Sequence, residues 1–144
     1  MHNGEKARIV LVAAKEDFLN SLRDALKETN LALLHAQTKH EAVVLLERLK
    51  SEIDLAIIDL ELPDLGGLDL IEQLTRHPRI PMKIIATTSV YPAPELAKVI
   101  DFGVDAVVPE TVSPEKWRIT VAAVLRKAKP AWASSKGSDV ENLK

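Results

Sequence analysis

The chain has 144 residues, a length that fits one domain, and its 47% hydrophobic and 28% charged residues are ordinary for a globular fold. It contains no cysteine, which excludes disulfides, thiolate metal sites and cysteine nucleophiles, and its four histidines lack metal-ligand spacing. A formal net charge of −2 and an aromatic content of 3% argue against direct nucleic-acid binding. With no signal peptide and no apolar run long enough to span a membrane, we expect a cytoplasmic protein that does not bind membranes.

The first part of the chain alternates a short apolar run with a segment of helical spacing. The run at residues 9–12 predicts a strand, and apolar side chains at i, i+4, i+7 and i+8 over residues 18–26 predict a helix after it. A second strand is predicted at residues 31–35. The next helix begins with a capping box, because Thr38 is a suitable N-cap and Glu41 follows three residues later.

The same alternation continues beyond residue 50. Strands are predicted at residues 55–58 and 83–87, and a helix with apolar positions over residues 68–74 lies between them. A fourth helix carries apolar side chains over residues 96–100, and Gly103 is well placed to end it.

The last strand and helix complete the pattern. The strand is predicted at residues 106–108, and the helix over residues 117–128 is preceded by Ser113 as N-cap and by Pro114 in the first turn. Residues 129–144 lose the apolar period and are predicted to be a polar tail or linker, so the domain itself spans residues 1–128.

Strands that alternate with helices indicate a parallel sheet with right-handed crossovers. The predicted fold class is therefore α/β, a doubly wound (βα)5 sheet of flavodoxin-like type with strand order 2-1-3-4-5. Ligands of such folds bind beyond the carboxyl ends of the strands. In this chain those ends carry Ala13 and Ala14, Asp59, Thr88 and Glu110.

One stretch is more specific than the rest. Residues 54–74 read DLAIIDLELPDLGGLDLIEQL, a buried strand that ends in Asp59 and leads through a Gly-Gly turn into a helix. This stretch resembles the phosphoacceptor region of response-regulator receiver domains (CheY-like). Residues 103–117, GVDAVVPETVSPEKW, align without a gap on the end of that family's pattern, and the resemblance covers roughly residues 7–128.

The resemblance implies a set of phosphoryl-transfer residues, which this chain keeps only in part. The family's acceptor falls on Asp59, and its phosphoryl-binding hydroxyl falls on Thr88. The acidic pair that holds Mg²⁺ falls on Ala13 and Ala14, and the lysine falls on Glu110. The three charged helpers of the family are therefore missing. Because such a transfer depends on positioning and charge neutralisation, the resemblance implies a degenerate pseudo-receiver without a metal or other cofactor.

Neighbouring charges offer substitutes for the missing helpers. Glu16 and Asp17 could replace the acidic pair, although acidic residues at a helix start are also favoured by the helix dipole. Glu61 could lean over the site, but we expect it to be exposed. Lys15 or Lys83 could supply a positive charge; Lys15 is the better candidate, although a solvated side chain is its default.

The resemblance also implies an interaction surface. Receiver-like domains dimerise or dock through their fourth helix, fifth strand and fifth helix. The candidate interface residues of this chain are Leu96, Val107, Trp117 and Ile119, with Val107 at the family's switch-aromatic position. The alternative for the fifth helix is that its apolar residues are simply buried.

Three functions remain open from the sequence. The first is a pseudo-receiver that is not an enzyme and signals through a protein partner or a homodimer. The second is a working phosphoacceptor of a two-component system or phosphorelay, which uses Asp59 and Mg²⁺ with a substitute cation or a partner's groups. The third is a small-ligand module that uses the pocket at the strand ends.

Overall fold

A computed structural model of the chain describes residues 6–27, 30–49, 52–63, 66–76, 81–90 and 93–127. The predicted tail, residues 129–144, lies outside these ranges. The sheet has five parallel strands in the order β2-β1-β3-β4-β5, which confirms the predicted topology. The strands are β1 (Ala7–Val12), β2 (Leu31–Ala36), β3 (Leu55–Asp59), β4 (Lys83–Thr88) and β5 (Ala106–Pro109).

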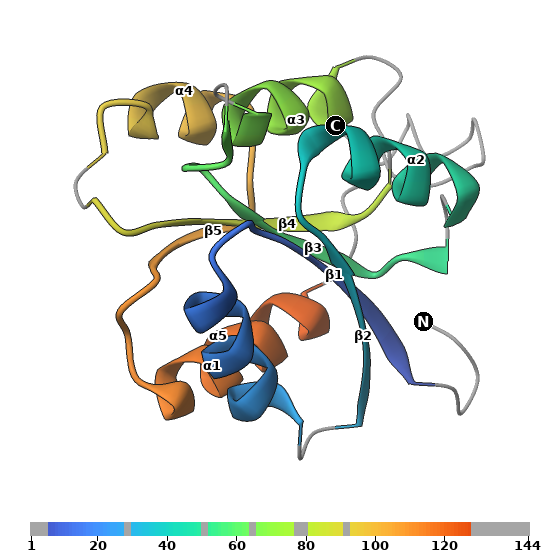
Figure 1. The fold of residues 1–144 in the computed structure, drawn as a ribbon, viewed down its shortest axis with the longest axis vertical. Coiled ribbons are helices and arrows are strands. Elements are labelled where there is room, and N and C mark those ends of the chain that lie inside the picture. Colours follow the sequence, from blue (N-terminus) through green and yellow to red (C-terminus); the bar gives the residue numbers. More distant parts are fainter. Residues whose placement is uncertain are drawn as a thin grey trace, which may run out of the picture.

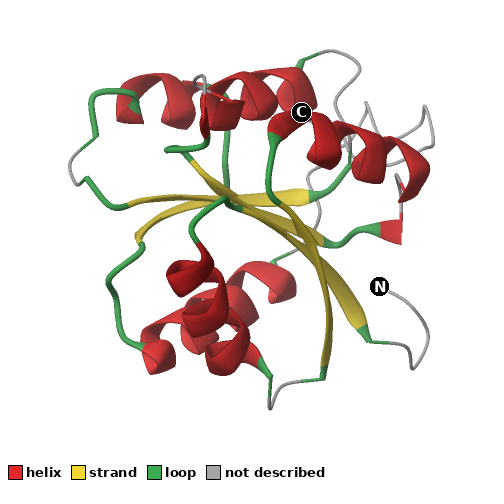
Figure 2. Ribbon diagram, in the orientation of Figure 1, coloured by secondary structure: helices red, strands yellow, loops and turns green. Residues whose placement is uncertain are grey.

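Five helices cover the two faces of this sheet. They are α1 (Glu16–Leu26), α2 (Lys39–Leu49), α3 (Gly66–Thr75), α4 (Leu96–Asp101) and α5 (Pro114–Arg126). Figure 1 shows α1 and α5 together on one face, and α2, α3 and α4 on the other. Figure 2 shows the resulting three layers of helix, sheet and helix. Within the described ranges, no helix is long and apolar enough to cross a membrane.

The alternation of side chains along each strand builds two cores. In β1, Ile9 and Leu11 pack against the α1–α5 layer, whereas Val10 and Val12 pack against α2, α3 and α4. All four side chains are at most 1% exposed. A strand covered on both faces needs a continuous apolar run, which explains why β1 and β3 show no polar alternation in the sequence.

The predicted helix-capping signals are present. The hydroxyl of Thr38 accepts from the backbone N–H of Glu41, and the Glu41 carboxylate in turn accepts from the N–H of Gln37. Ser113 accepts from the N–H of Lys116 at the start of α5. Gly103 follows α4 with a φ of 86°, a left-handed conformation that favours glycine.

Close packing at the end of β3 requires the second glycine of the Gly-Gly turn. A Cβ atom on Gly67 would lie 2.2 Å from the carbonyl oxygen of Asp59 and 2.8 Å from the Cα of Leu60. The start of α3 therefore packs directly on the backbone that carries Asp59.

The sheet register brings three predicted site residues to one edge. Asp59 is the register partner of Thr87, and Thr88 is that of Pro109. The N–H of Glu110 also donates to the carbonyl oxygen of Thr88 at 2.9 Å. Asp59, Thr88 and Glu110 thus follow one another along the carboxyl edge of β3, β4 and β5.

Two candidate residues lie away from the surface or site that the sequence offered them, and for Trp117 burial was the open alternative. Trp117 was a candidate interface residue, but it is 3% exposed and packs against Phe18, with ring centroids 6.0 Å apart. Its large apolar ring fills the core between α1 and α5. Lys83 lies at the start of β4, away from the site, where its amine donates to the carbonyl oxygens of Leu125 and Lys127 at the end of α5.

Candidate functional site

Asp59 is the most buried of the three acidic residues of the site. It ends β3 and is 1% exposed. Its Oδ1 atom accepts from the N–H of Glu61 at 2.9 Å, and its Oδ2 atom lies 3.5 Å from the Nζ atom of Lys15. Burial raises the pKa of Asp59, and the Glu61 N–H and the charge of Lys15 only partly oppose that effect.

Lys15 is the central cation of the site. It lies in the short loop between β1 and α1, and its Nζ atom is 2.6 Å from Oε2 of Glu110 and 3.1 Å from Oε1 of Glu61. Partial burial alone would lower the pKa of Lys15, but the hydrogen bonds to Glu110 and Glu61 and the charge of Asp59 outweigh it and raise the pKa to about 12. Lys15 is therefore a permanent cation in contact with three carboxylates, although its side chain is still 40% exposed.

Glu61 is exposed as expected, and its carboxylate also lies over the site. Its carboxylate accepts from the hydroxyl of Thr88 and from both the N–H and the hydroxyl of Ser89. Desolvation acts to raise the pKa of Glu61, but the donors of Ser89 and Thr88 and the Lys15 amine overcome it and lower the pKa to about 2. Glu61 is thus ionised throughout the physiological range.

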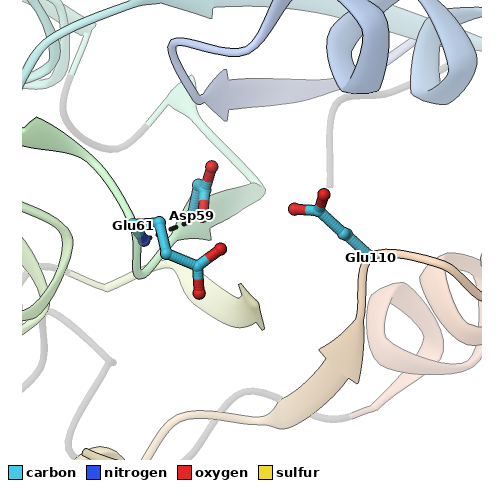
Figure 3. Close-up of side chains that lie close together, drawn as sticks. All are labelled: Asp59, Glu61 and Glu110. Atoms are coloured by element: carbon cyan, nitrogen blue, oxygen red, sulfur yellow. Dashed lines mark hydrogen bonds between the residues drawn. The ribbon is translucent and has the colours of Figure 1, made fainter. Parts of the chain in front are cut away.

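Glu110 completes the group from the end of β5. Figure 3 shows its carboxylate directed toward Asp59 and Glu61, which come from the end of β3. The three residues offer carboxylate oxygens that all lie within 4.8 Å of one another. These oxygens are too close to remain ionised without a positive charge between them, and Lys15 supplies that charge.

Comparisons with known proteins agree with this fold. Residues 9–122 match the response regulator receiver domain family. The chain belongs to the response-regulator receiver family.

Individual relatives are distant. A putative two-component response regulator of Arabidopsis thaliana, ARR20, is 30% identical over 79 residues, which are 55% of this chain and 18% of that protein. The chain thus matches less than a fifth of that relative's length.

Three solved structures are similar along most of their length. A CheY-like receiver domain protein of Methanospirillum hungatei JF-1 has a TM-score of 0.70 at 26% identity, covering 84% of this chain and 94% of that one. The receiver domain of a putative Luxo repressor protein of Vibrio parahaemolyticus has a TM-score of 0.74 at 24% identity, covering 84% of this chain and 91% of that one. The BeF3-activated N-terminal receiver domain of Klebsiella pneumoniae RstA has a TM-score of 0.73 at 18% identity, covering 83% of this chain and 99% of that one.

Compared with the receiver pattern, this site has a positive charge after β1 and a negative charge at the end of β5. The loop after β1, where the pattern has its acidic pair, here carries the cation Lys15, and the end of β5, where the pattern has its lysine, carries Glu110. Ala13 is 2% exposed and packs in the α1–α5 core, and Ala14 packs against the other core. Both alanines therefore pack in the cores, and neither position provides a carboxylate at the end of β1.

A Mg²⁺ ion does not fit this arrangement. The oxygens of Asp59, Glu61 and Glu110 are the donors that Mg²⁺ prefers, but the Lys15 amine lies within 2.6–3.5 Å of all three groups. An incoming divalent cation would have to displace an ammonium that already pairs with all three groups. Glu16 and Asp17 do not replace the acidic pair, because they are exposed on the first turn of α1 and lie outside the acidic cluster.

Proposed function

We propose that this receiver domain is a pseudo-receiver, a binding module that signals through protein–protein contact without phosphorylation of Asp59. The observation that carries this proposal is the contact of Lys15 with Asp59, Glu61 and Glu110. It suggests a site whose carboxylates are paired with a cation of the same chain, with no use for a phosphoryl group or a metal.

Electrostatics support this proposal. A unit charge about 4 Å away contributes about 4 kcal/mol at an effective dielectric of about 20. A phosphoryl group on Asp59 would lie among the carboxylates of Glu61 and Glu110, with Lys15 as the neutralising cation. The transfer depends on neutralising charge as it develops, so both the reaction and its product are disfavoured here.

Access to Asp59 points the same way. A phosphoryl donor must reach the acceptor oxygen, but Asp59 is 1% exposed and has Lys15 and Glu61 against its two oxygens. The same packing argues against a small ligand seated on Asp59, because the chain's own side chains occupy that position.

The interaction surface belongs to this proposal as well. On α5, Ile119 is 58% exposed, and on α4, Ile100 is 62% exposed. These helices flank β5, the edge of the sheet. Leu96 and Val107 are partly buried beside them and pack against the core. We infer that a protein partner or a second copy of the chain binds here, that the module acts in the cytoplasm, and that it is not an enzyme.

Beryllofluoride with Mg²⁺ tests the proposal, since a relative of the same fold has been described in a BeF3-activated form. We expect no change in the amide NMR spectrum of the native chain. The matched positive control is the variant Ala13→Asp, Ala14→Asp, Glu110→Lys, which restores the family's charges and is expected to gain Mg²⁺ affinity. Beryllofluoride binding by the native chain contradicts the proposal, and a restored variant without Mg²⁺ affinity shows that the alignment of these positions is wrong.

A further inference from the structure

The carboxylate of Glu61 is held by donors from another strand. The hydroxyl of Thr88 and the N–H and hydroxyl of Ser89 all donate to it, and the Lys15 amine lies 3.1 Å from its Oε1 atom. Thr88 is completely buried. Such a set of converging donors and one cation is what an oxyanion requires, although Thr88 also donates to the carbonyl oxygen of Val90 and Lys15 also donates to Glu110.

The backbone fixes Glu61 in this position. Its N–H donates to Oδ1 of Asp59 at 2.9 Å, which holds its main chain. Its carboxylate accepts from the hydroxyl of Thr88 at the end of β4, which holds its side chain. One of its carboxylate oxygens lies within 4.8 Å of an oxygen of Asp59. It also makes two contacts that the resemblance assigns to a phosphoryl group, one with the hydroxyl at Thr88 and one with a lysine amine.

We propose that Thr88, Ser89 and Lys15 form an oxyanion-binding site that Glu61 fills from within the chain. The native domain is then permanently in its anion-occupied state, and removal of the Glu61 carboxylate opens the site to a tetrahedral oxyanion such as inorganic phosphate. This inference rests on the proposed function and deepens it, because it explains how a domain without phosphorylation keeps one fixed conformation at the end of β4.

Energetics set the expected size of the effect. A hydrogen bond to a charged group contributes about 1.5–3 kcal/mol, so regaining even one of the vacated donors corresponds to at least about tenfold in affinity. Loss of the negative charge of Glu61 acts in the same direction. Glu110 remains near Lys15 and limits the gain, since the two are in contact at 2.6 Å.

The experiment is a titration of the full chain with inorganic phosphate in EDTA, followed by the amide resonances of Thr88 and Ser89. We expect Glu61→Ala to bind phosphate at least about tenfold more tightly than the native chain. We further expect phosphate to move the Ser89 resonance of this variant back toward its native position. Equal, weak binding by the native chain and Glu61→Ala would overturn the proposal.

Three further variants make the result specific. Glu61→Ala with Thr88→Val is expected to lose the gained affinity, whereas Glu47→Ala, which removes one exposed carboxylate from α2, is expected to behave as the native chain. If Glu61→Ala does not fold, Glu61→Ser provides the same open site, and phosphate is expected to raise its melting temperature. The titration contains no Mg²⁺ and tests only the oxyanion site, whereas the beryllofluoride experiment tests the pseudo-receiver proposal. Either proposal can therefore be contradicted while the other is supported.

Discussion

The Nζ atom of Lys15 lies 2.6 Å from Oε2 of Glu110, which joins the loop after β1 to the end of β5. The two residues are 95 positions apart in the chain. Alanines replace the acidic pair at the first strand end, Glu110 replaces the lysine at the last one, and Lys15, which follows the alanines, pairs with Glu110. The site therefore retains internal neutrality between these two ends, although the pattern's metal-binding pair and lysine are both absent.

A double-mutant cycle measures this contact. We expect Lys15→Met and Glu110→Gln to be coupled by about 1 kcal/mol in the free energy of unfolding, a value reduced by solvent screening because the Lys15 side chain is 40% exposed. The Lys27–Asp24 pair is the matched control, since its atoms are 3.9 Å apart and both side chains are more than 60% exposed. Urea unfolding of the four chains in each cycle gives the two coupling energies. Equal values for both pairs would show that the Lys15–Glu110 contact is no stronger than a surface ion pair.

The pH dependence of stability tests the environment of Glu61. Its pKa in the folded chain is about 2, below the ordinary 4.5, so its ionised form stabilises the fold above pH 4.5 and this stabilisation is lost as the pH falls toward 2. The loss is about 1–2 kcal/mol, discounted because the side chain is 31% exposed. We expect the stability difference between the native chain and Glu61→Gln to shrink over that range. A difference that does not change with pH would mean that Glu61 is not held by these donors.

Asp59 is expected to behave in the opposite way. Its pKa is raised above the ordinary 3.8, so the ionised carboxylate destabilises the fold above the raised pKa, and this cost disappears as the pH falls below 3.8. We therefore expect Asp59→Asn to be more stable than the native chain at neutral pH and to lose that advantage in acid. Thermal unfolding at a series of pH values checks this, with Asp17→Asn on exposed α1 as the control. A neutral-pH loss of stability would show that Asp59 acts mainly as the partner of Lys15.

The packing of α3 on the end of β3 gives a prediction for the Gly-Gly turn. In Gly67→Ala the new Cβ atom meets backbone at 2.2 Å, so α3 or β3 must shift, and we expect a loss of about 1–3 kcal/mol in the free energy of unfolding. Gly66→Ala is the matched control, because its nearest contact is a side-chain atom at 3.2 Å. We expect the smaller loss for Gly66→Ala, and the reverse order would contradict the packing of the turn.

Most of the fold could be predicted from the sequence because its signals are local. The apolar runs, the Thr38 cap and the position of Gly103 each depend on a few neighbouring residues, and the structure confirms them. The observed strands differ mainly at their ends: β2 continues to Ala36, and β3 includes Asp59.

The site was predicted only in part because its contacts are not local. Asp59, Thr88 and Glu110 could be placed at strand ends by the topology, but the direction of a long flexible side chain such as Lys15 or Glu61 depends on what surrounds it in space. The available signal was a count of charges. Three acidic residues at one sheet edge need a nearby cation, and Lys15 is positioned on the adjacent loop. Trp117 shows the same limit, since its burial depends on Phe18 in a different helix.

Incubation of the native chain with acetyl phosphate and Mg²⁺, followed by intact-mass measurement, tests the central claim most directly. Asp59 is buried under Lys15 and Glu61, so we predict no added phosphoryl mass on the native chain, and none on Asp59→Asn. A phosphoryl adduct on the native chain that is absent from Asp59→Asn would contradict the claim and make this domain a working phosphoacceptor.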